Sequence, residues 1–437
     1  MPDHARSSDP AVQTQLDCLA RLSPGRDILG LERITALLAR LGDPHHRLPP
    51  VFHVAGTNGK GSTCAFLRAA LEADGKSVHV FTSPHLVRFN ERLRLNGVLI
   101  DDPALAHYLG RVIDEADDIG ASFFEVTTAA AFLAFSEHPA DGCVIEVGLG
   151  GRLDATNVIT APAACGIAQL GIDHQAFLGD TLLEIAAEKA GIAKSGAPLI
   201  TMKYPDSVSN TIQAMATQAR APYFAMGQDW DAAVYRDKLH YRDVEGRIDT
   251  PLPRMPGSHQ SMNAALAIAM LRHQKSIAVS EAAIKAAPLW AHWPARLQRL
   301  ESGPLADLVP NAQIWLDGGH NPAAGEALGK HFHTNLAPGQ KIHLILGMLS
   351  NKDPGGFLAP LRDYIGSLHA VPVPEHDHHS PAALVELVSR WDIAAQAHDC
   401  VKTALRALND DGSSSILIAG SLYLAGEVLQ QNEQLPT

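Results

Sequence analysis

The most informative segment of this 437-residue chain reads His53-Val54-Ala55-Gly56-Thr57-Asn58-Gly59-Lys60-Gly61-Ser62-Thr63. An apolar run at 51–55 leads into a glycine-rich turn with one lysine, and an amphipathic run follows at 64–73. This order predicts a strand, an anion-binding loop and a helix. The glycines let backbone N–H groups approach a phosphate, the lysine adds charge, and the helix directs its positive end to the same place. A nucleoside triphosphate is therefore the first ligand that we expect.

The turn departs from the common phosphate loop at two positions. Val54 stands where that pattern has its first glycine, and Gly61 stands where it has a magnesium-binding Ser or Thr. A hydroxyl follows one residue later, at Ser62. We therefore expect the metal to need a ligand from another segment. A glycine-rich turn that binds nothing is the alternative.

Bulk composition limits the class of protein. The formal net charge of −12 argues against a nucleic-acid surface, and no apolar run approaches the roughly 18 residues of a transmembrane helix. Residues 1–20 are polar, so we expect no signal peptide. Five scattered cysteines suit reduced thiols better than disulfides or a zinc cluster. We expect a cytoplasmic monomer that binds neither nucleic acid nor a membrane.

The alternation of apolar and helical patterns predicts an α/β chain with two domains. For the N-terminal domain, residues 1–293, we expect a P-loop ATPase-like fold with a mostly parallel sheet. One helix is expected before the sheet, at 30–41, a β-hairpin insertion within 232–256, and a helix at 261–272. The expected strands are 51–55, 77–82, 143–147, 165–170, 198–202 and 222–226.

The smaller C-terminal domain, residues 294–437, has the pattern of a doubly wound, Rossmann-like fold. Its expected strands are 313–317, 343–347, 365–370 and 415–419, and its expected helices are 321–332, 381–389, 401–408 and 422–431. Two domains of this kind predict a ligand site in a cleft between them.

Three polar residues follow expected strands, where ligands bind in α/β sheets. Glu146 ends an apolar strand and could hold magnesium, and Ser83 could supply the hydroxyl that the turn lacks. Arg88 begins the basic run 88–92, which suits a substrate carboxylate. The alternatives are a carboxylate that caps a helix, an ordinary Ser-Pro turn and a solvated charged loop.

Further ionisable residues lie in both domains. His174 could complete a metal shell, and Lys189 lies on a mostly apolar helix pattern that disfavours its ammonium form. An exposed cation at a helix end is the alternative for Lys189. Asp317 and His320 share a strand-to-helix turn in the second domain. Arg296 precedes that turn and could reach a triphosphate or form a hinge salt bridge.

Taken together, these residues resemble the folylpolyglutamate synthase/dihydrofolate synthase family, within the Mur ligase superfamily of ATP-dependent amide-forming ligases. The resemblance covers nearly the whole chain, and its most specific strings are 146–157 and 421–426. The matching segments, in the family's order, are 30–33, 53–63, 82–86, 88–92, 146–157, 173–189, 259–265, 317–322 and 420–426.

The resemblance implies a role for each candidate residue. The residues that would contact ATP are Thr57, Asn58, Gly59, Lys60, Gly61, Ser62, Asn263, Arg296 and Asp317. Two magnesium ions would be held by Ser83, Glu146, His174 and Lys189, the last as a carbamate. The catalytic residues would be Lys60, Lys189, Asp317 and His320. The residues that would approach the substrate are Leu29, Gly30, Leu31, Arg88, Phe124 and Asp154.

The activity that the resemblance implies is ATP-dependent joining of L-glutamate to 7,8-dihydropteroate, giving dihydrofolate, and to reduced folates, giving folylpolyglutamates. ATP would phosphorylate the carboxylate, and the glutamate amine would attack the acyl phosphate. A Mur-type ligase for a nucleotide-linked peptide is a second hypothesis, which the short segment before the first strand disfavours. A non-catalytic ATP-binding regulator is a third, and the intact set of Lys60, Glu146, His174 and Lys189 counts against it.

Two positions depart from the family's pattern. Gly319 stands where members often have alanine, and Asn351 replaces the first carboxylate of an Asp-Lys-Asp run. Neither belongs to the magnesium set, so we expect activity to be retained, with glutamate handling altered at Asn351. The histidine-rich run 376–379 has no standard metal-ligand spacing, and we interpret it as a polar loop.

Overall fold

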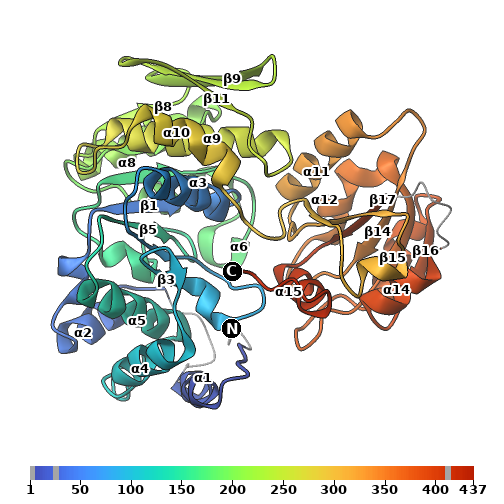
Figure 1. The fold of residues 1–437 in the computed structure, drawn as a ribbon, viewed down its shortest axis with the longest axis horizontal. Coiled ribbons are helices and arrows are strands. Elements are labelled where there is room, and N and C mark those ends of the chain that lie inside the picture. The colour runs from blue at the N-terminus through green and yellow to red at the C-terminus, as the bar shows by residue number, and fades with distance from the viewer. Residues whose placement is uncertain (1–4, 23–28, 409–414) are drawn as a thin grey trace. The chain divides into compact units, whose positions relative to one another are not determined.

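The computed structural model describes residues 5–22, 29–408 and 415–437 (Figure 1). The chain divides into two compact units. The N-terminal unit comprises Met1–Arg254, Gln260–His292 and Thr437, and the C-terminal unit comprises Met255–His259 and Trp293–Pro436. The functions assigned to the two domains stay predictions.

A mostly parallel sheet forms the centre of the N-terminal unit. Its described strands are β1 (Val51–Ala55), β2 (Val78–Phe81), β3 (Leu93–Leu95), β4 (Val98–Leu99), β5 (Gly142–Glu146), β6 (Ala164–Ile167), β7 (Leu199–Thr201) and β8 (Tyr223–Ala225). They run in the order β4-β3-β2-β5-β1-β6-β7-β8. The pairs β2–β3 and β3–β4 are antiparallel, and the other pairs of these strands are parallel. Every residue of β1 and β5 is buried, as expected for strands covered on both faces.

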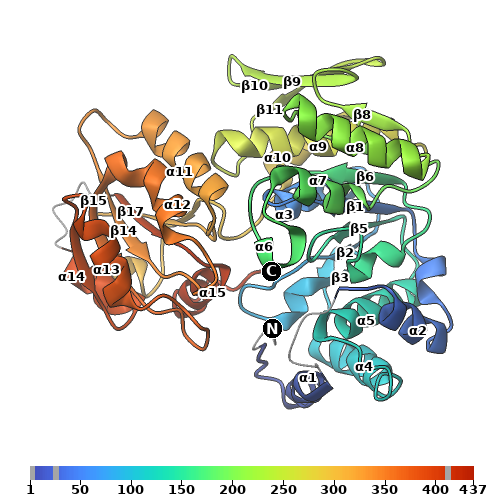
Figure 2. The same ribbon diagram turned by 180° about the vertical axis from the view of Figure 1, so that it is seen from behind.

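Helices cover both faces of this sheet, with α3 on one side of β1 and α5 on the other (Figures 1 and 2). The α-helices of this part are α1 (Pro10–Leu22), α2 (Glu32–Arg40), α3 (Lys60–Ala73), α4 (Asp102–Ile113), α5 (Phe123–Glu137), α6 (Gln175–Leu178), α7 (Leu182–Ala190), α8 (Asp206–Ala219), α9 (Ser258–His273) and α10 (Glu281–Trp290). Short 3-10 helices are η1 (Pro44–Arg47), η2 (Phe89–Arg92) and η3 (Ala155–Val158).

The N-terminal segment holds a helix that we did not expect. The expected helix at 30–41 corresponds to α2, but α1 precedes it. Val12, Leu16 and Leu19 of α1 are buried in the core that α2, α4 and α5 also line. Their spacing is that of one helix face, so a sequence signal for α1 was present, although polar residues surround it.

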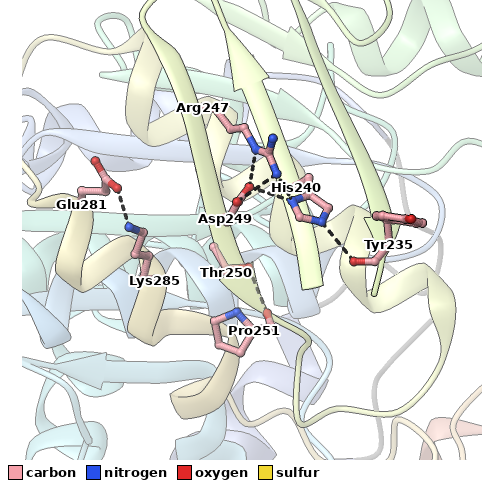
Figure 3. A network of polar contacts seen from close by, with 8 residues as sticks. All are labelled: Tyr235, His240, Arg247, Asp249, Thr250, Pro251, Glu281 and Lys285. Atoms are coloured by element: carbon pink, nitrogen blue, oxygen red, sulfur yellow. Dashed lines mark hydrogen bonds and ion pairs between the residues drawn. The ribbon is translucent and has the colours of Figure 1, made fainter. Parts of the chain in front are cut away.

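The insertion after β8 is a three-stranded antiparallel sheet among the described residues, so the expected hairpin was wrong by one strand. The strands are β9 (Trp230–Tyr235), β10 (Lys238–Asp243) and β11 (Gly246–Pro251), in the order β11-β10-β9. Asp249 of β11 accepts a hydrogen bond from Arg247 Nε at 2.6 Å and lies 2.7 Å from His240 Nδ1 on β10 (Figure 3). Such charged side chains interrupt the apolar alternation, which explains why the sequence predicted two strands here and not three.

The C-terminal unit is a second α/β layer structure. Its described strands are β12 (Gln298–Leu300), β13 (Gln313–Leu316), β14 (Ile342–Leu346), β15 (Ile365–Ala370), β16 (Ala394–Ala397) and β17 (Ser415–Ala419), in the order β12-β13-β17-β14-β15-β16. The helices are α11 (Pro322–Asn335), α12 (Pro354–Leu358), α13 (Pro381–Ser389), α14 (Val401–Ala407), α15 (Leu422–Gln431), η4 (Ala306–Leu308) and η5 (Ala359–Tyr364).

The expected fold class is confirmed, because a large, mostly parallel sheet is followed by a second, Rossmann-like sheet. The edge strands β12 and β16 were not expected, because β12 is three residues long and β16 is alanine-rich and largely exposed. The P-loop ATPase-like character of the first unit stays a prediction. Within the described ranges, we find no helix that is both long and apolar enough to cross a bilayer.

Candidate active site

The glycine-rich turn joins β1 to α3 and is tied to the segment after β6. The backbone N–H groups of Thr57 and Asn58 donate to the carbonyl of Gln169 at 2.9 and 3.1 Å. The Thr57 hydroxyl donates to the carbonyl of Gly171 at 3.0 Å. These N–H groups therefore point into the protein. The groups that can meet an anion are the first N–H groups of α3, at Lys60, Gly61 and Ser62, which lack helical partners by geometry.

Gly59 is the N-cap of α3 and has a left-handed backbone, with φ of +81°. A Cβ at this position would collide with Oδ1 of Asn263, which is buried on α9. Asn263 is itself oriented by Gln260, since its Nδ2 donates to Gln260 Oε1 at 3.1 Å. The structure thus brings Asn263 against the turn, although the two segments are far apart in the sequence.

Lys60, Glu146 and Ser83 lie together at the carboxyl ends of neighbouring strands. Lys60 Nζ is 3.9 Å from Glu146 Oε1 and 3.4 Å from the carbonyl oxygen of Thr57. The N–H of Ser83 donates to Glu146 Oε2 at 3.4 Å. Carboxylate and hydroxyl oxygens are the ligands that magnesium takes in proteins, so the donor set fits that ion.

Lys189 lies on α7 and is only 4% exposed, so the exposed-cation alternative for this residue was wrong. Burial, and to a smaller extent the charge of Lys60, lower the pKa of Lys189 to about 7 against the opposing effects of Asp173 and Asp154. A substantial fraction of this side chain is therefore a neutral amine at neutral pH. A neutral amine is nucleophilic, whereas an ammonium group is not.

His174 follows Asp173 in an exposed loop at the start of α6. Its backbone is left-handed, with φ of +52°, and its N–H donates to Asp173 Oδ1 at 2.8 Å. Asp173 in turn acts electrostatically on Lys189. The residue before His174 therefore lies within electrostatic range of Lys189.

Asp154 is buried and held by a chain of hydrogen bonds. Asp154 Oδ1 accepts from the Thr156 N–H at 3.0 Å and from the Thr156 hydroxyl at 2.5 Å, while Oδ2 accepts from the Leu149 N–H at 2.8 Å. Because the Thr156 hydroxyl donates to Asp154, it accepts from His53 Nε2, 2.8 Å away. Burial raises the pKa of Asp154 and lowers that of His53 to about 3, so His53 is neutral.

Phe124 lies over the end of β5. A Cβ on Gly148 would collide with the Phe124 ring, so glycine at 148 makes room for the aromatic side chain. The Phe124 ring centroid is 6.0 Å from that of Phe81 on β2. The remaining residues expected near the substrate, Leu29, Gly30 and Leu31, are half-buried just before α2.

The basic run 88–92 is not a solvated loop throughout. Arg88 is exposed, but Arg92 is buried, with its guanidinium 5.0 Å from the Phe89 ring centroid and its Nε donating to His85 Nδ1 at 3.0 Å. Glu91 accepts the N–H groups of three residues, including that of Arg88 at 2.7 Å. Of the two arginines, Arg88 is therefore the one that solvent and solutes can reach.

The C-terminal unit brings its own candidates together at the ends of β13 and α11. Asp317 is buried and accepts the N–H of Leu297 at 2.8 Å and that of Gly319 at 2.7 Å. His320 Nδ1 lies 2.9 Å from the carbonyl oxygen of Gly318. A Cβ placed on Gly318 would lie 3.1 Å from Arg296 Nη1, so the arginine crosses the same turn.

Three residues of these networks were not singled out in the sequence. His53 and Thr156 form the chain to Asp154, and both lie inside segments that the family resemblance had marked. His259 lies beside Asp317 and Arg296: burial lowers its pKa, Asp317 raises it and Arg296 lowers it. The segment 259–265 had also been marked, but nothing in its residue types distinguished a buried histidine from an exposed one.

Comparisons with known proteins match both units. The model for the Mur ligase middle domain matches residues 54–271, and that for the dihydrofolate synthetase C-terminal domain matches residues 306–431. The folylpolyglutamate synthase of Lacticaseibacillus casei is 34% identical over 421 residues, which are 91% of this chain and 93% of that protein. The chain belongs to the folylpolyglutamate synthase/dihydrofolate synthase family.

Solved structures agree with this membership. A structure of Escherichia coli FolC in complex with DHPP and ADP has a TM-score of 0.86, with 32% identity over 97% of each chain. A Mycobacterium tuberculosis folylpolyglutamate synthase complexed with ADP and AMPPCP has a TM-score of 0.83, with 29% identity over 97% of this chain and 100% of that one. The expected family and enzyme class, an ATP-dependent ligase of the Mur type, are confirmed. The role of each site residue stays a prediction.

Proposed function

We propose that the protein joins L-glutamate to 7,8-dihydropteroate and to reduced folates, with conversion of ATP to ADP and phosphate. Family membership supports this reaction. FolC of Escherichia coli has been solved with DHPP and ADP, and a bifunctional synthase of 28% identity with Mn, AMPPNP and L-glutamate. We further propose that the protein acts as a cytoplasmic monomer.

The buried Lys189 is the observation that carries the proposal, because a neutral, desolvated amine suits one chemistry in particular. Its nitrogen attacks the carbon of CO₂ and loses one proton, which leaves a carbamate anion. The cation of Lys60 nearby stabilises that anion. A carbamate offers two oxygens to a divalent cation, as a carboxylate does.

We assign two magnesium ions to this unit. Ser83 and Glu146 would hold one, and His174 with carbamylated Lys189 would hold the other. When bound, the ions offset negative charge on the phosphates. Oxygen donors predominate in both sets, which is the preference of magnesium.

In the proposed reaction, an oxygen of the substrate carboxylate attacks the γ-phosphorus of ATP, and ADP leaves. Lys60 and the N-terminus of α3 stabilise charge on the phosphates, while Asn263 fixes the turn. The glutamate amine then attacks the acyl carbon, loses a proton and expels phosphate. We propose that Arg296 and Asp317 of the C-terminal unit contact ATP, and that Asp317 and His320 take part in catalysis. Arg296 carries the positive charge that a phosphate needs.

An isotope experiment tests the acyl phosphate. Dihydropteroate labelled with ¹⁸O in its carboxylate is converted in the presence of ATP, magnesium and glutamate, and the released phosphate is analysed by mass. We expect one ¹⁸O atom in each phosphate, because the attacking oxygen leaves with phosphorus. Formation of dihydrofolate and ADP with unlabelled phosphate would exclude the acyl phosphate.

A further inference from the structure

We propose that Asp43, His45 and His46 bind a divalent cation of the zinc type, at a site separate from the glycine-rich turn. Across the described residues, this is the one group of three or more His, Cys, Asp or Glu side chains with ligand atoms all within 4.8 Å of one another. Two imidazoles and one carboxylate are a donor set that Zn²⁺, Co²⁺ and Ni²⁺ accept, whereas magnesium prefers oxygen.

The backbone presents these three side chains on one short turn between α2 and β1. Asp43 has a left-handed backbone, with φ of +52°, and its N–H donates to the carbonyl of Leu38 at 2.8 Å. The N–H of His46 donates to the carbonyl of Asp43 at 3.1 Å. Pro44 is buried, and the 3-10 helix η1 that carries both histidines packs on α5. The donors are therefore held in place before a cation arrives, which favours binding.

The two imidazole rings lie close together. Their ring centroids are 3.9 Å apart and their planes are inclined by 40°. Nδ1 of His45 is buried and has no hydrogen-bond partner within the described part of the chain. A metal ion would accept the lone pair of this nitrogen.

Charge at the site is balanced by two neighbours of opposite sign. The Asp43 carboxylate attracts a cation. Arg47 opposes a cation, but its Nη1 donates to the carbonyl of Gly42 at 2.6 Å, which directs the guanidinium to the backbone. A cation that binds two imidazoles covalently tolerates this charge better than one held by charge alone.

A second histidine-rich run shows what a similar sequence does without this geometry. Residues 376–379 also contain an aspartate followed by two histidines. There, His378 Nδ1 lies 2.7 Å from the carbonyl oxygen of His376, and His379 Nε2 lies 2.9 Å from that of Lys352. Each ring therefore uses one nitrogen on the backbone. This pair is a matched control for the site at 43–46.

Calorimetric titration of the full chain with ZnCl₂, in excess magnesium, tests the proposal. Magnesium occupies oxygen-rich sites and leaves imidazoles available. We expect the unmodified protein and the control His378→Gln/His379→Gln to bind one equivalent of zinc. We expect His45→Gln/His46→Gln to weaken zinc binding at least roughly tenfold. Removing the hydrogen-bond partner of a metal ligand already weakens binding by about that factor, and removing the ligand itself should weaken it more.

Asp43→Asn serves as a milder variant, because asparagine tolerates the left-handed backbone. It should weaken zinc binding while circular dichroism stays unchanged, and Co²⁺ absorption should report the altered ligand set. Failure of the unmodified protein to bind zinc would overturn the proposal. Equal zinc affinity of the unmodified protein and the 43, 45 and 46 variants would overturn it as well.

Discussion

Lys189 is almost completely buried and lies within electrostatic range of Lys60, Asp173 and Asp154. We predict that Lys189→Ala abolishes amide formation with the fold intact, because no carbamate can form. Lys189→Arg should also be inactive, since a guanidinium stays charged and does not react with CO₂. Dihydrofolate production and circular dichroism check both variants. Near-normal turnover by either one would remove the carbamate role.

The same lysine should make stability depend on pH. Its pKa of about 7 lies below the ordinary 10.5, so near neutral pH the unfolded chain binds a proton that the folded chain lacks. This difference lowers the free energy of unfolding. The reduction is complete below pH 7 and becomes smaller as the pH rises toward 10.5. In CO₂-free buffer, Lys189→Met should therefore raise the free energy of unfolding more at pH 7 than at pH 9.5. We expect the two gains to differ by roughly 2–3 kcal/mol.

Urea unfolding at the two pH values measures this difference. Lys285→Met is a control, because Lys285 is exposed and pairs with Glu281 at 2.6 Å (Figure 3). Equal gains at both pH values for Lys189→Met would contradict a neutral, buried amine.

Thr156 links two buried groups through one hydroxyl. Thr156→Val keeps the shape, but it leaves His53 Nε2 without this partner and removes one of the two hydrogen bonds that Asp154 Oδ1 accepts from residue 156. An unpaired buried polar group costs about 1–3 kcal/mol, so the free energy of unfolding should fall by at least that amount. Thr156→Ser retains the hydroxyl and should lose less. Equal losses in urea unfolding would show that the hydroxyl contributes nothing.

At the scale of elements, the contact between the glycine-rich turn and α9 should set nucleotide affinity. Gly59→Ala introduces a Cβ that collides with Asn263, whereas Gly75→Ala has nothing within 4 Å. Both glycines have left-handed φ, +81° and +72°, so both variants should lose stability, by roughly 1–2 kcal/mol. Only Gly59→Ala should weaken ATP binding in calorimetry. Equal ATP affinities would show that the contact does not shape the site.

The central strands of the first sheet were predictable because protein covers both of their faces. Strands β1, β5 and β6 are buried on both faces and read as continuous apolar runs. Short or exposed edge strands such as β4 and β16 carry no such pattern. Helix α1 was missed because polar residues surround its apolar positions, although Val12, Leu16 and Leu19 have helical spacing.

The part of the candidate site that follows from the order of strands in the sheet was predictable from the sequence. Glu146 and Ser83 follow adjacent parallel strands, so their meeting near Lys60 follows from the order of the sheet. The burial of Lys189 and the chain from His53 to Asp154 depend on how distant segments pack. Residue types alone favoured an exposed cation at a helix end for Lys189, and only the family resemblance pointed to the carbamate.

At the scale of the whole molecule, the central claim is a ligase that accepts two carboxylate substrates. Both reactions need the same treatment of ATP and glutamate and differ in what holds the pterin end. The residues proposed for ATP lie in both units, whereas those proposed for the pterin, such as Phe124 and Asp154, lie in the N-terminal unit. Loss of the pterin contacts should therefore leave ATP binding intact.

The most direct measurement is a product assay on the purified full chain. The protein receives ATP, magnesium and L-glutamate with either 7,8-dihydropteroate or tetrahydrofolate, and mass spectrometry identifies the products. We predict dihydrofolate from the first acceptor, a folate longer by one glutamate from the second, and one ADP for each amide bond. Product from a single acceptor would remove the other activity from the proposal. No product from either acceptor, with ATP still bound, would contradict the central claim.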